Sequence, residues 1–131
     1  MILDTSVVAG LMLGEPQARD LREHVAGEER LAMGAPTLAE TGAVLEARLN
    51  ILGWTLLRRF VEELGVTVIP FTAEHARVAV DAFTRFGRGR HPAALNFGDC
   101  LTYATAMVSG ERLLCLDDDF ARTDIALVVQ P

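Results

Sequence analysis

Hydrophobic and polar positions alternate along the chain in short blocks with two different spacings. Brief apolar runs bounded by glycine, proline or acidic residues predict strands at about residues 1–3, 30–34, 66–71, 112–116 and 125–129. Between them, apolar residues recur every three or four positions, which predicts helices at about residues 5–13, 16–26, 37–50, 54–65, 73–86 and 97–109. Strands that alternate with helices over the whole length predict an α/β fold, a central and mostly parallel β-sheet flanked by helices.

The remaining stretches read as turns and as one longer loop. Residues 87–96, with the sequence GRGRHPAALN, form that loop, residues 117–124 form a turn, and Gly53 separates two helices. Thr5 or Ser6 is placed to cap the first helix. Neither an internal repeat nor a linker interrupts the 131 residues, so we expect a single domain over residues 1–131.

The composition bears on membrane association and on the state of the two cysteines. Half of the residues are hydrophobic, yet no apolar run approaches the roughly 20 residues that a membrane span needs, so no membrane partner is expected. Cys100 and Cys115 lie in apolar segments, and no secretory leader precedes them. Reduced thiols in a cytoplasmic protein are therefore expected, with Cys100 as part of the core.

The absence of lysine excludes two classes of protein. The formal net charge is −6, and all 12 positive side chains are arginine, so the chain has no lysine. Phosphatases of the haloacid dehalogenase type and phosphate-accepting receiver domains both need a lysine, and neither class fits. Guanidinium groups still allow bidentate contacts with phosphate.

Two acidic positions follow predicted strands. Asp4 ends the first strand, and Asp117 or Asp118 follows the strand at residues 112–116. If these strands are parallel, the acids emerge at the same edge of the sheet, where ligands bind in such folds. The alternative is that each aspartate only forms a turn or caps a helix.

Two further acids lie on predicted helices. Glu40 shares a stripe with Val44, Ala47 and Ile51, opposite an apolar stripe that contains Leu45, which predicts that Glu40 is packed and needs a partner. Asp99 points with Tyr103 and Ala106 rather than with the polar Thr102, Thr105 and Ser109. The alternative for Asp99 is a helix-end role, because Asn96 is placed as the N-cap.

Together these acids predict a metal site. Two carboxylates about 5 Å apart repel by roughly 3 kcal/mol at an effective dielectric constant near 20. A divalent cation offsets that repulsion, and a set of oxygen ligands without an evident group of His or Cys suits Mg²⁺ or Mn²⁺. Such an ion polarises a phosphoryl oxygen and activates a water molecule.

Four segments carry a family resemblance that spans nearly the whole chain. They are MILDTSVVAGLMLGEP, LAETGAVLEARL, NFGDCLTYATA and LLCLDDDFARTDI. In these motifs the chain resembles PIN-domain ribonucleases and, more narrowly, the VapC toxins of type II toxin–antitoxin pairs. The resemblance implies a PIN fold and endonucleolytic cleavage of RNA, often tRNA or rRNA, with Mg²⁺ or Mn²⁺.

The resemblance also assigns residues and partners. The first three family acids map to Asp4, Glu40 and Asp99, and the fourth maps to Asp117 or Asp118. Asp119, next to Phe120, is expected to serve the turn. The expected partners are a VapB-type antitoxin and a second copy of the toxin, in a homodimer and in a heterotetramer or larger assembly with the antitoxin.

Several basic residues are candidates for RNA contacts. Arg88, Arg90 and His91 lie in the loop at residues 87–96, and Arg112 precedes a strand. The alternative for the loop is an exposed polar segment with no ligand. For the whole chain, the alternative to a ribonuclease is a catalytically silent PIN-like module that binds a small protein partner.

Overall fold

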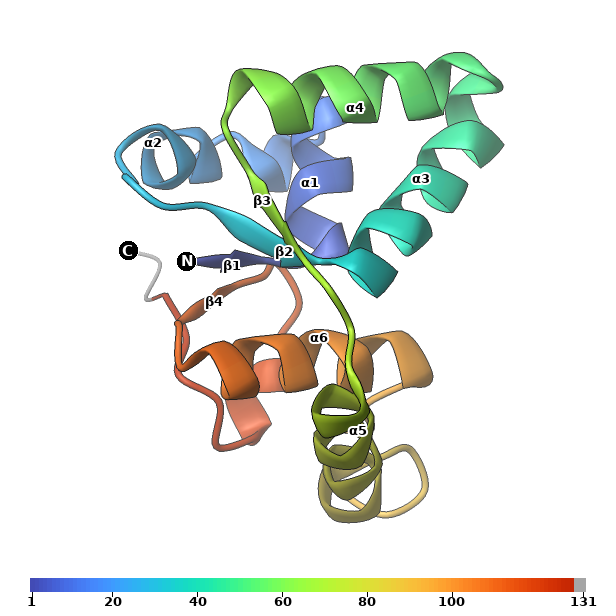
Figure 1. The fold of residues 1–131 in the computed structure, drawn as a ribbon, viewed down its shortest axis with the longest axis vertical. Helices are drawn as coiled ribbons and strands as arrows, with labels where there is room; N and C mark the ends of the chain where they lie inside the picture. The colour runs from blue at the N-terminus through green and yellow to red at the C-terminus, as the bar shows by residue number, and fades with distance from the viewer. Residues whose placement is uncertain (129–131) are drawn as a thin grey trace.

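A central sheet of four parallel strands organises the molecule (Figure 1). The computed structural model describes residues 1–128. In the order of the sheet, the strands are β3 Thr67–Ile69, β2 Ala32–Gly34, β1 Ile2–Leu3 and β4 Leu113–Leu114. The helices are α1 Thr5–Met12, α2 Leu21–Ala26, α3 Ala35–Leu49, α4 Leu52–Glu63, α5 Ala73–Phe86 and α6 Phe97–Ser109, with short 3-10 turns η1 Pro16–Ala18 and η2 Asp119–Arg122. The predicted α/β fold with a parallel sheet is confirmed.

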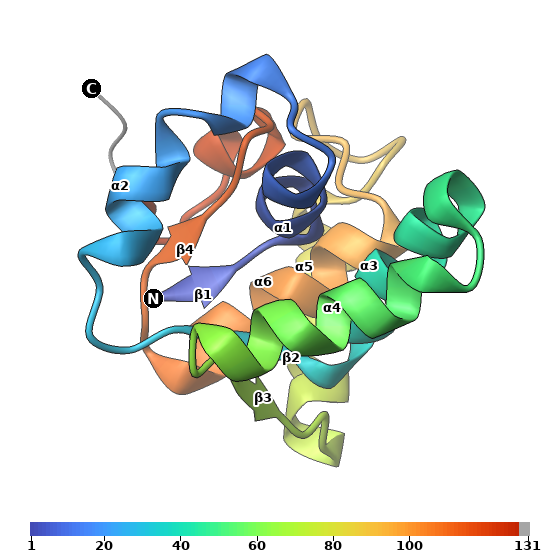
Figure 2. The ribbon, with the colours of Figure 1, turned by 90° about the horizontal axis from the view of Figure 1, so that it is seen from above.

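Both faces of the short strands are covered. Neighbouring strand residues enter opposite cores: Ile2 packs with α5 and α6, whereas Leu3 packs with α1, α2 and α4. Both side chains have no exposed surface. Figures 1 and 2 show the same division, with α1 to α4 on one side of the sheet and α5 and α6 on the other. Continuous apolar runs are typical of parallel strands buried in this way.

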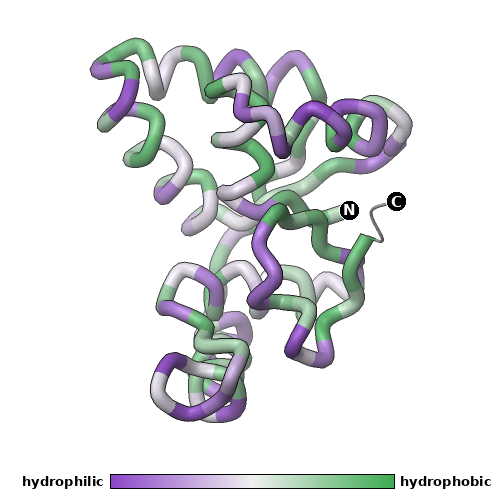
Figure 3. Tube along the Cα trace, turned by 180° about the vertical axis from the view of Figure 1, so that it is seen from behind, coloured by the Kyte–Doolittle hydropathy of each residue, from purple (hydrophilic) through white to green (hydrophobic). Residues whose placement is uncertain are grey.

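The outer helices are amphipathic. The chain alternates between hydrophobic and hydrophilic stretches along them (Figure 3). The apolar spacing therefore predicted α5 and α6 with the bounds that the structure has. Thr102 and Thr105, expected on a polar face of α6, are instead buried, and the Thr102 hydroxyl lies 3.1 Å from that of Thr37 on α3.

Three expectations about elements were wrong. The helix expected at residues 16–26 is broken at residues 19–20 into η1 and α2. Gly53 does not separate two helices but lies inside α4, where a side chain would meet the backbone of Leu45 on α3. In the described part of the expected strand at residues 125–129, only an isolated parallel bridge forms, between Leu113 and Leu127, and Val129 lies outside the described residues.

The topology brings several chain segments to one edge of the sheet. The carboxyl ends of β1, β2 and β4 lead into α1, α3 and residues 115–119, respectively. Functional groups gather at this edge in open parallel sheets. Within residues 1–128, no helix combines the length and the apolar character needed to cross a membrane.

Candidate active site

Asp4 is the fixed point of the acidic edge. It is 6% exposed and is the N-cap of α1, where its Oδ2 accepts hydrogen bonds from the Ser6 N–H (3.0 Å) and from the Ser6 hydroxyl (2.6 Å). The Ser6 Oγ in turn accepts a hydrogen bond from the Leu116 N–H at 3.1 Å. The expectation that Thr5 or Ser6 caps the helix is corrected: Asp4 is the cap, and Ser6 ties it to the segment after β4.

Asp99 reaches the same edge from the first turn of α6. Asn96 is the N-cap, and the two residues form a capping box in which the Asn96 N–H donates to Asp99 Oδ2 (2.9 Å) and the Asp99 N–H donates to Asn96 Oδ1 (2.8 Å). Burial raises the pKa of Asp99 to about 6 against the lowering effect of the Asn96 hydrogen bond, and the charges of Asp4, Asp119 and Glu40 raise it further. Asp99 therefore serves the helix end and also faces other acids.

Glu40 is not packed as its stripe predicted. Glu40, Val44, Ala47 and Ile51 are all exposed, because α3 buries the opposite stripe that contains Leu45. The carboxylate of Glu40 nevertheless lies against α6, since a side chain added at Gly98 would overlap it. Glu40 is thus an exposed acid that borders the site beside Asp99.

The three aspartates after β4 differ in their surroundings. Partial burial, followed by the charges of Asp4, Asp119, Asp118 and then Glu15, raises the pKa of Asp117. Asp118 is the N-cap position of η2 but makes no side-chain cap bond. Asp119 begins η2, and its charge is among those that raise the pKa of Asp99.

The charge of Asp119 therefore acts on Asp99, and Asp119 also starts a turn; sequence reasoning assigned it to the turn alone. The available signal was Phe120, which is 1% exposed and anchors the turn in the core. We call Asp4, Glu40, Asp99, Asp117 and Asp119 the acidic edge.

The acidic edge suits a cation that keeps most of its water. Among residues 1–128, no three Asp, Glu, His or Cys side chains are arranged to hold one metal ion together. A closed zinc site needs such a group, whereas Mg²⁺ is held by one or two carboxylates together with water and substrate phosphates. The hydrogen bonds described for Asp4 and Asp99 use Oδ2 alone, which leaves one carboxylate oxygen of each for a cation.

The predicted basic residues lie in two places. Arg88, Arg90 and His91 are in the loop between α5 and α6, and Arg122 of η2 fastens that loop by donating to the Pro92 carbonyl at 3.2 Å. His91 is part of the loop structure, because its Nδ1 accepts the Ala93 N–H at 3.0 Å.

Arg112 is not brought to the acids. It directly precedes β4, at the amino ends of the strands, and lines a hollow with Met1 and Glu111. That edge of the sheet is opposite the acidic edge.

The cysteines offer no nucleophile. Both are buried, and burial raises the pKa of Cys100 to about 11 and that of Cys115 to about 12. Both thiols are protonated at neutral pH, in agreement with the expected core role of Cys100.

A hydrogen-bond network that sequence reasoning missed holds the segment after η2. The Tyr103 hydroxyl donates to Asp124 Oδ1 (2.6 Å), and Arg85 donates to Asp124 Oδ2 (3.0 Å). Burial raises the pKa of Tyr103 to about 12, and the hydrogen bond from Tyr103 lowers the pKa of Asp124. The network fastens α5 and α6 to the chain behind the acidic edge.

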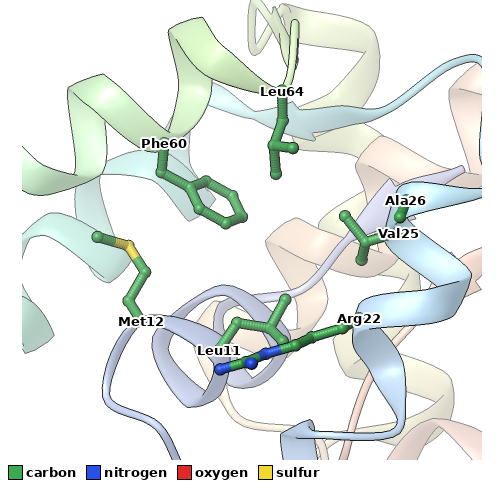
Figure 4. Close-up of a pocket in the computed structure, with 7 residues that line it drawn as sticks. All are labelled: Leu11, Met12, Arg22, Val25, Ala26, Phe60 and Leu64. Carbon is green, nitrogen blue, oxygen red and sulfur yellow. The ribbon is translucent and has the colours of Figure 1, made fainter.

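Away from the acids, an apolar groove of about 290 Å³ opens between α1, α2 and α4. Figure 4 shows Phe60 and Leu64 pointing into it from α4, Leu11 and Met12 from α1, and Arg22 along its border. Its remaining lining is Val25 and Ala26. A surface of this kind suits an apolar segment of another protein.

Fold and site together define an α/β protein with carboxylates collected at the carboxyl edge of a parallel sheet. The model of the PIN domain family matches residues 1–126, and the chain belongs to this family.

Curated relatives cover nearly the whole chain. Ribonuclease VapC36 of Mycobacterium tuberculosis is 48% identical over 126 residues, which are 95% of this chain and 91% of the relative. Ribonuclease VapC30 of the same species is 35% identical over 131 residues, with 100% of both chains covered.

Solved structures share the fold. VapC20 of M. tuberculosis, described as a sarcin–ricin loop cleaving toxin, has a TM-score of 0.80 at 20% identity and covers 98% of both chains. A toxin–antitoxin complex from Klebsiella pneumoniae has a TM-score of 0.71 at 17% identity, covering 97% of this chain and 95% of its own.

Proposed function

We propose that the chain is a Mg²⁺- or Mn²⁺-dependent endoribonuclease that acts as the toxin of a toxin–antitoxin pair. The observation that carries the proposal is the acidic edge, where burial and the charges of Asp4, Asp119 and Glu40 raise the pKa of Asp99 to about 6. Relatives named as ribonucleases, at 48% and 35% identity, support the same activity. A tRNA or an rRNA is the proposed substrate.

Each acid has a proposed part. Asp4 and Asp99 would hold the principal cation, because a helix cap fixes each of them and no hydrogen bond described for residues 1–128 involves the other carboxylate oxygen. Glu40, Asp117 and Asp119 would complete the set through water molecules. When bound, the cation polarises a phosphoryl oxygen and lowers the pKa of a water molecule. Ser6 keeps the Asp4 carboxylate in place, and Arg88 and Arg90 bind phosphates beside the site.

The test is cleavage of structured RNAs by the purified protein in Mn²⁺ and in EDTA. We expect cleavage in Mn²⁺ only, and a loss of at least about 100-fold in the double variant Asp4→Asn, Asp99→Asn. The double variant Asp20→Asn, Asp81→Asn removes two exposed acids away from the site and is expected to keep full activity. Cleavage that persists in EDTA or in the first variant would show that the metal mechanism is wrong.

The fourth acid is tested one residue at a time. We expect Asp117→Asn and Asp119→Asn to lose activity and Asp118→Asn to retain most of it. Equal activity in all three variants would remove this segment from the site. If the wild-type protein cuts no RNA but binds a small partner tightly, the silent interaction module becomes the better explanation.

The proposed antitoxin binds in the apolar groove between α1, α2 and α4. An apolar, amphipathic segment of a small protein matches its lining, with Arg22 available for an acidic group at the border. We expect an antitoxin gene immediately upstream, whose product copurifies with the wild-type protein. Leu64→Arg, in the groove, should abolish copurification, whereas Leu56→Arg, on the same helix and similarly exposed (37% against 40%), should not. Equal retention by both variants would place the partner elsewhere.

A second copy of the chain is the proposed occupant of another apolar surface. Between α5 and α6 lies a groove of about 330 Å³ bordered by Val80, Phe83 and Phe97, which are 67%, 40% and 75% exposed. An exposed apolar groove with large side chains at its border suits contact with another protein surface. An RNA substrate and buried, reduced thiols further support a cytoplasmic location.

A further inference from the structure

A polar groove of about 370 Å³ continues the acidic edge along α1 and α3. Its polar lining consists of Thr5, Ser6 and Asp117, which adjoin the candidate active site, together with Glu15, Gln17 and Arg48. Hydroxyl, amide, carboxylate and guanidinium groups therefore face one hollow next to the acids. This lining differs from that of the two apolar grooves, and it suits a polar, charged ligand.

Arg48 is the only positively charged residue among those of residues 1–128 that line this groove. It is exposed, and no hydrogen bond or ion pair described for residues 1–128 involves its side chain. By contrast, Arg30, Arg58 and Arg85 each have an acidic partner within 4 Å. The Arg48 guanidinium is thus available for a ligand.

A purely structural role accounts for only part of this arrangement. Arg48 lies in the last turn of α3, where a positive charge interacts favourably with the helix dipole. That interaction explains a cation near the helix end, but any side of the last turn would serve it equally well. It does not explain why the cation lines a groove shared with Asp117 and Ser6.

The chain as a whole repels a polyanion, so cations near the acids decide where one binds. The net charge is −6, and the groove itself contains Glu15 and Asp117. A phosphate in this groove needs a local counter-charge, which Arg48 alone supplies there among the described residues. The Thr5 hydroxyl and the Gln17 amide add neutral hydrogen-bond donors.

Arg48 lies farther along α3 than Glu40, which borders the candidate active site. It follows Glu40 by eight residues on α3, which corresponds to about 12 Å along the helix axis. The loop with Arg88 and Arg90 lies on the other side of the site: Figure 1 shows the carboxyl end of α3 at the upper right and the loop before α6 at the lower right. A nucleic-acid strand across the acidic edge would meet cations on both sides.

We infer that Arg48 binds a backbone phosphate of the RNA to one side of the bond that is cut, and that the polar groove guides the strand away from the acids. This inference rests on the proposed ribonuclease function and adds a positioning residue to it. Arg48 does not touch the reacting atoms. Its effect is on the binding of the substrate.

The test compares Arg48→Gln with Arg59→Gln, which removes the same charge from an exposed arginine of α4 that lines none of the grooves described above. For cleavage in Mn²⁺, Arg48→Gln should raise KM about tenfold while kcat stays within about twofold. The slope of log affinity against log salt should fall by about one unit. Arg48→Lys should recover part of the loss, because an ammonium still binds phosphate as a point charge. Arg59→Gln should match the wild-type protein.

The same change is then measured for binding alone, with labelled tRNA and the cleavage-deficient variant Asp4→Asn, Asp99→Asn. We expect Arg48→Gln to weaken binding about tenfold in this background. If the wild-type protein cleaves RNA while Arg48→Gln keeps its KM and salt slope, the inference is overturned and the proposed function stands. If no RNA is cleaved but binding depends on Arg48, the proposed function is overturned and the phosphate site is supported. If the wild-type protein does not cleave RNA and Arg48→Gln does not weaken binding, both the proposed function and the phosphate site are overturned.

Discussion

Asp4 and Asp99 each use one carboxylate oxygen in a helix cap, and within the described part of the chain the other oxygen makes no hydrogen bond. For Asp4 the bonded atom is Oδ2, held by Ser6, and for Asp99 it is Oδ2, held by the Asn96 N–H. The cap fixes the direction of the carboxylate. An exposed acid that is only weakly held has no such fixed direction. Helix capping and metal binding, set against each other as alternatives for these residues, are therefore compatible.

The raised pKa of Asp99 predicts that this residue destabilises the fold at neutral pH. Its folded-state pKa of about 6 lies above the ordinary value of 3.8, so the folded protein binds the proton more tightly than the unfolded chain. The stabilising contribution of Asp99 is fully present below about pH 4 and is lost as the pH rises through about 6. Without divalent cations, Asp99→Asn should therefore increase the free energy of unfolding at pH 7.5 by about 1–2 kcal/mol, allowing for partial solvent screening.

Urea denaturation in EDTA at pH 4.5 and 7.5 measures this effect. The side-chain amide oxygen that Asp99→Asn introduces can still accept the Asn96 N–H, so the cap is retained. The control is Asp20→Asn, because Asp20 is an exposed N-cap residue of α2 without a side-chain cap bond. It should change the free energy of unfolding equally at the two pH values. The wild-type protein should lose stability between pH 4.5 and pH 7.5. An equally large loss in Asp99→Asn would contradict the prediction.

At the scale of elements, α3 and α6 meet where a glycine leaves room for Glu40. A methyl group at Gly98 would overlap the Glu40 carboxylate, whose Cδ would lie 3.2 Å from it. Because the obstacle is the end of a flexible side chain, Gly98→Ala should displace Glu40 rather than the helices. Alanine also favours a helix over glycine by about 1 kcal/mol.

Gly98→Ala should therefore lower RNA cleavage while the protein stays as stable or becomes more stable. A misplacement of this size near the chemistry reduces activity by up to about 100-fold. Thermal unfolding and cleavage rates test the two parts, and in a Glu40→Ala background the same change should have no further effect on the rate. A fall in both stability and activity would indicate a packing defect and not a displaced carboxylate.

The elements also show what the sequence could and could not predict. Apolar periodicity located α5 and α6 to the residue, because it depends on contacts that each helix makes along its whole length. The periodicity predicted on which side of α3 Glu40 lies. It did not predict which element, if any, packs against that side. The stripe with Val44 and Ile51 was predicted to be packed, although α4 lies against another face and leaves that stripe exposed. The break between α3 and α4 falls at Asn50, with a φ of 57°, while Gly53 serves their close approach.

The site shows the same limit. Parallel strands predicted that Asp4 and the aspartates after β4 share an edge, and the fold confirms that edge. Which aspartate faces Asp99 depends on the single turn η2, whose backbone the run of three acids does not specify. Arg48 was not singled out for the same reason, since the groove that it lines exists only once α1 and α3 are packed.

At the scale of the whole molecule, the surface between α5 and α6 adjoins the acidic edge. Phe97 belongs to this surface and begins α6, two residues before Asp99. Self-association through this face would place the two acidic edges of a dimer near their shared interface. An RNA strand that runs between Arg48 and the loop with Arg88 would then be bounded on one side by the second copy of the protein.

Val80→Asp tests that association, because Val80 is 67% exposed and its replacement should leave the fold intact. A carboxylate buried without a partner in the interface should weaken the dimer at least tenfold, which corresponds to about 1.4 kcal/mol. The matched control is Ile51→Asp, which places the same charge on a residue that is 79% exposed at the turn between α3 and α4. In sedimentation velocity over a concentration series, we expect dimers of the wild-type protein and of Ile51→Asp, and monomers of Val80→Asp. A monomeric wild-type protein would refute self-association, and dimers of all three proteins would place the interface on another face.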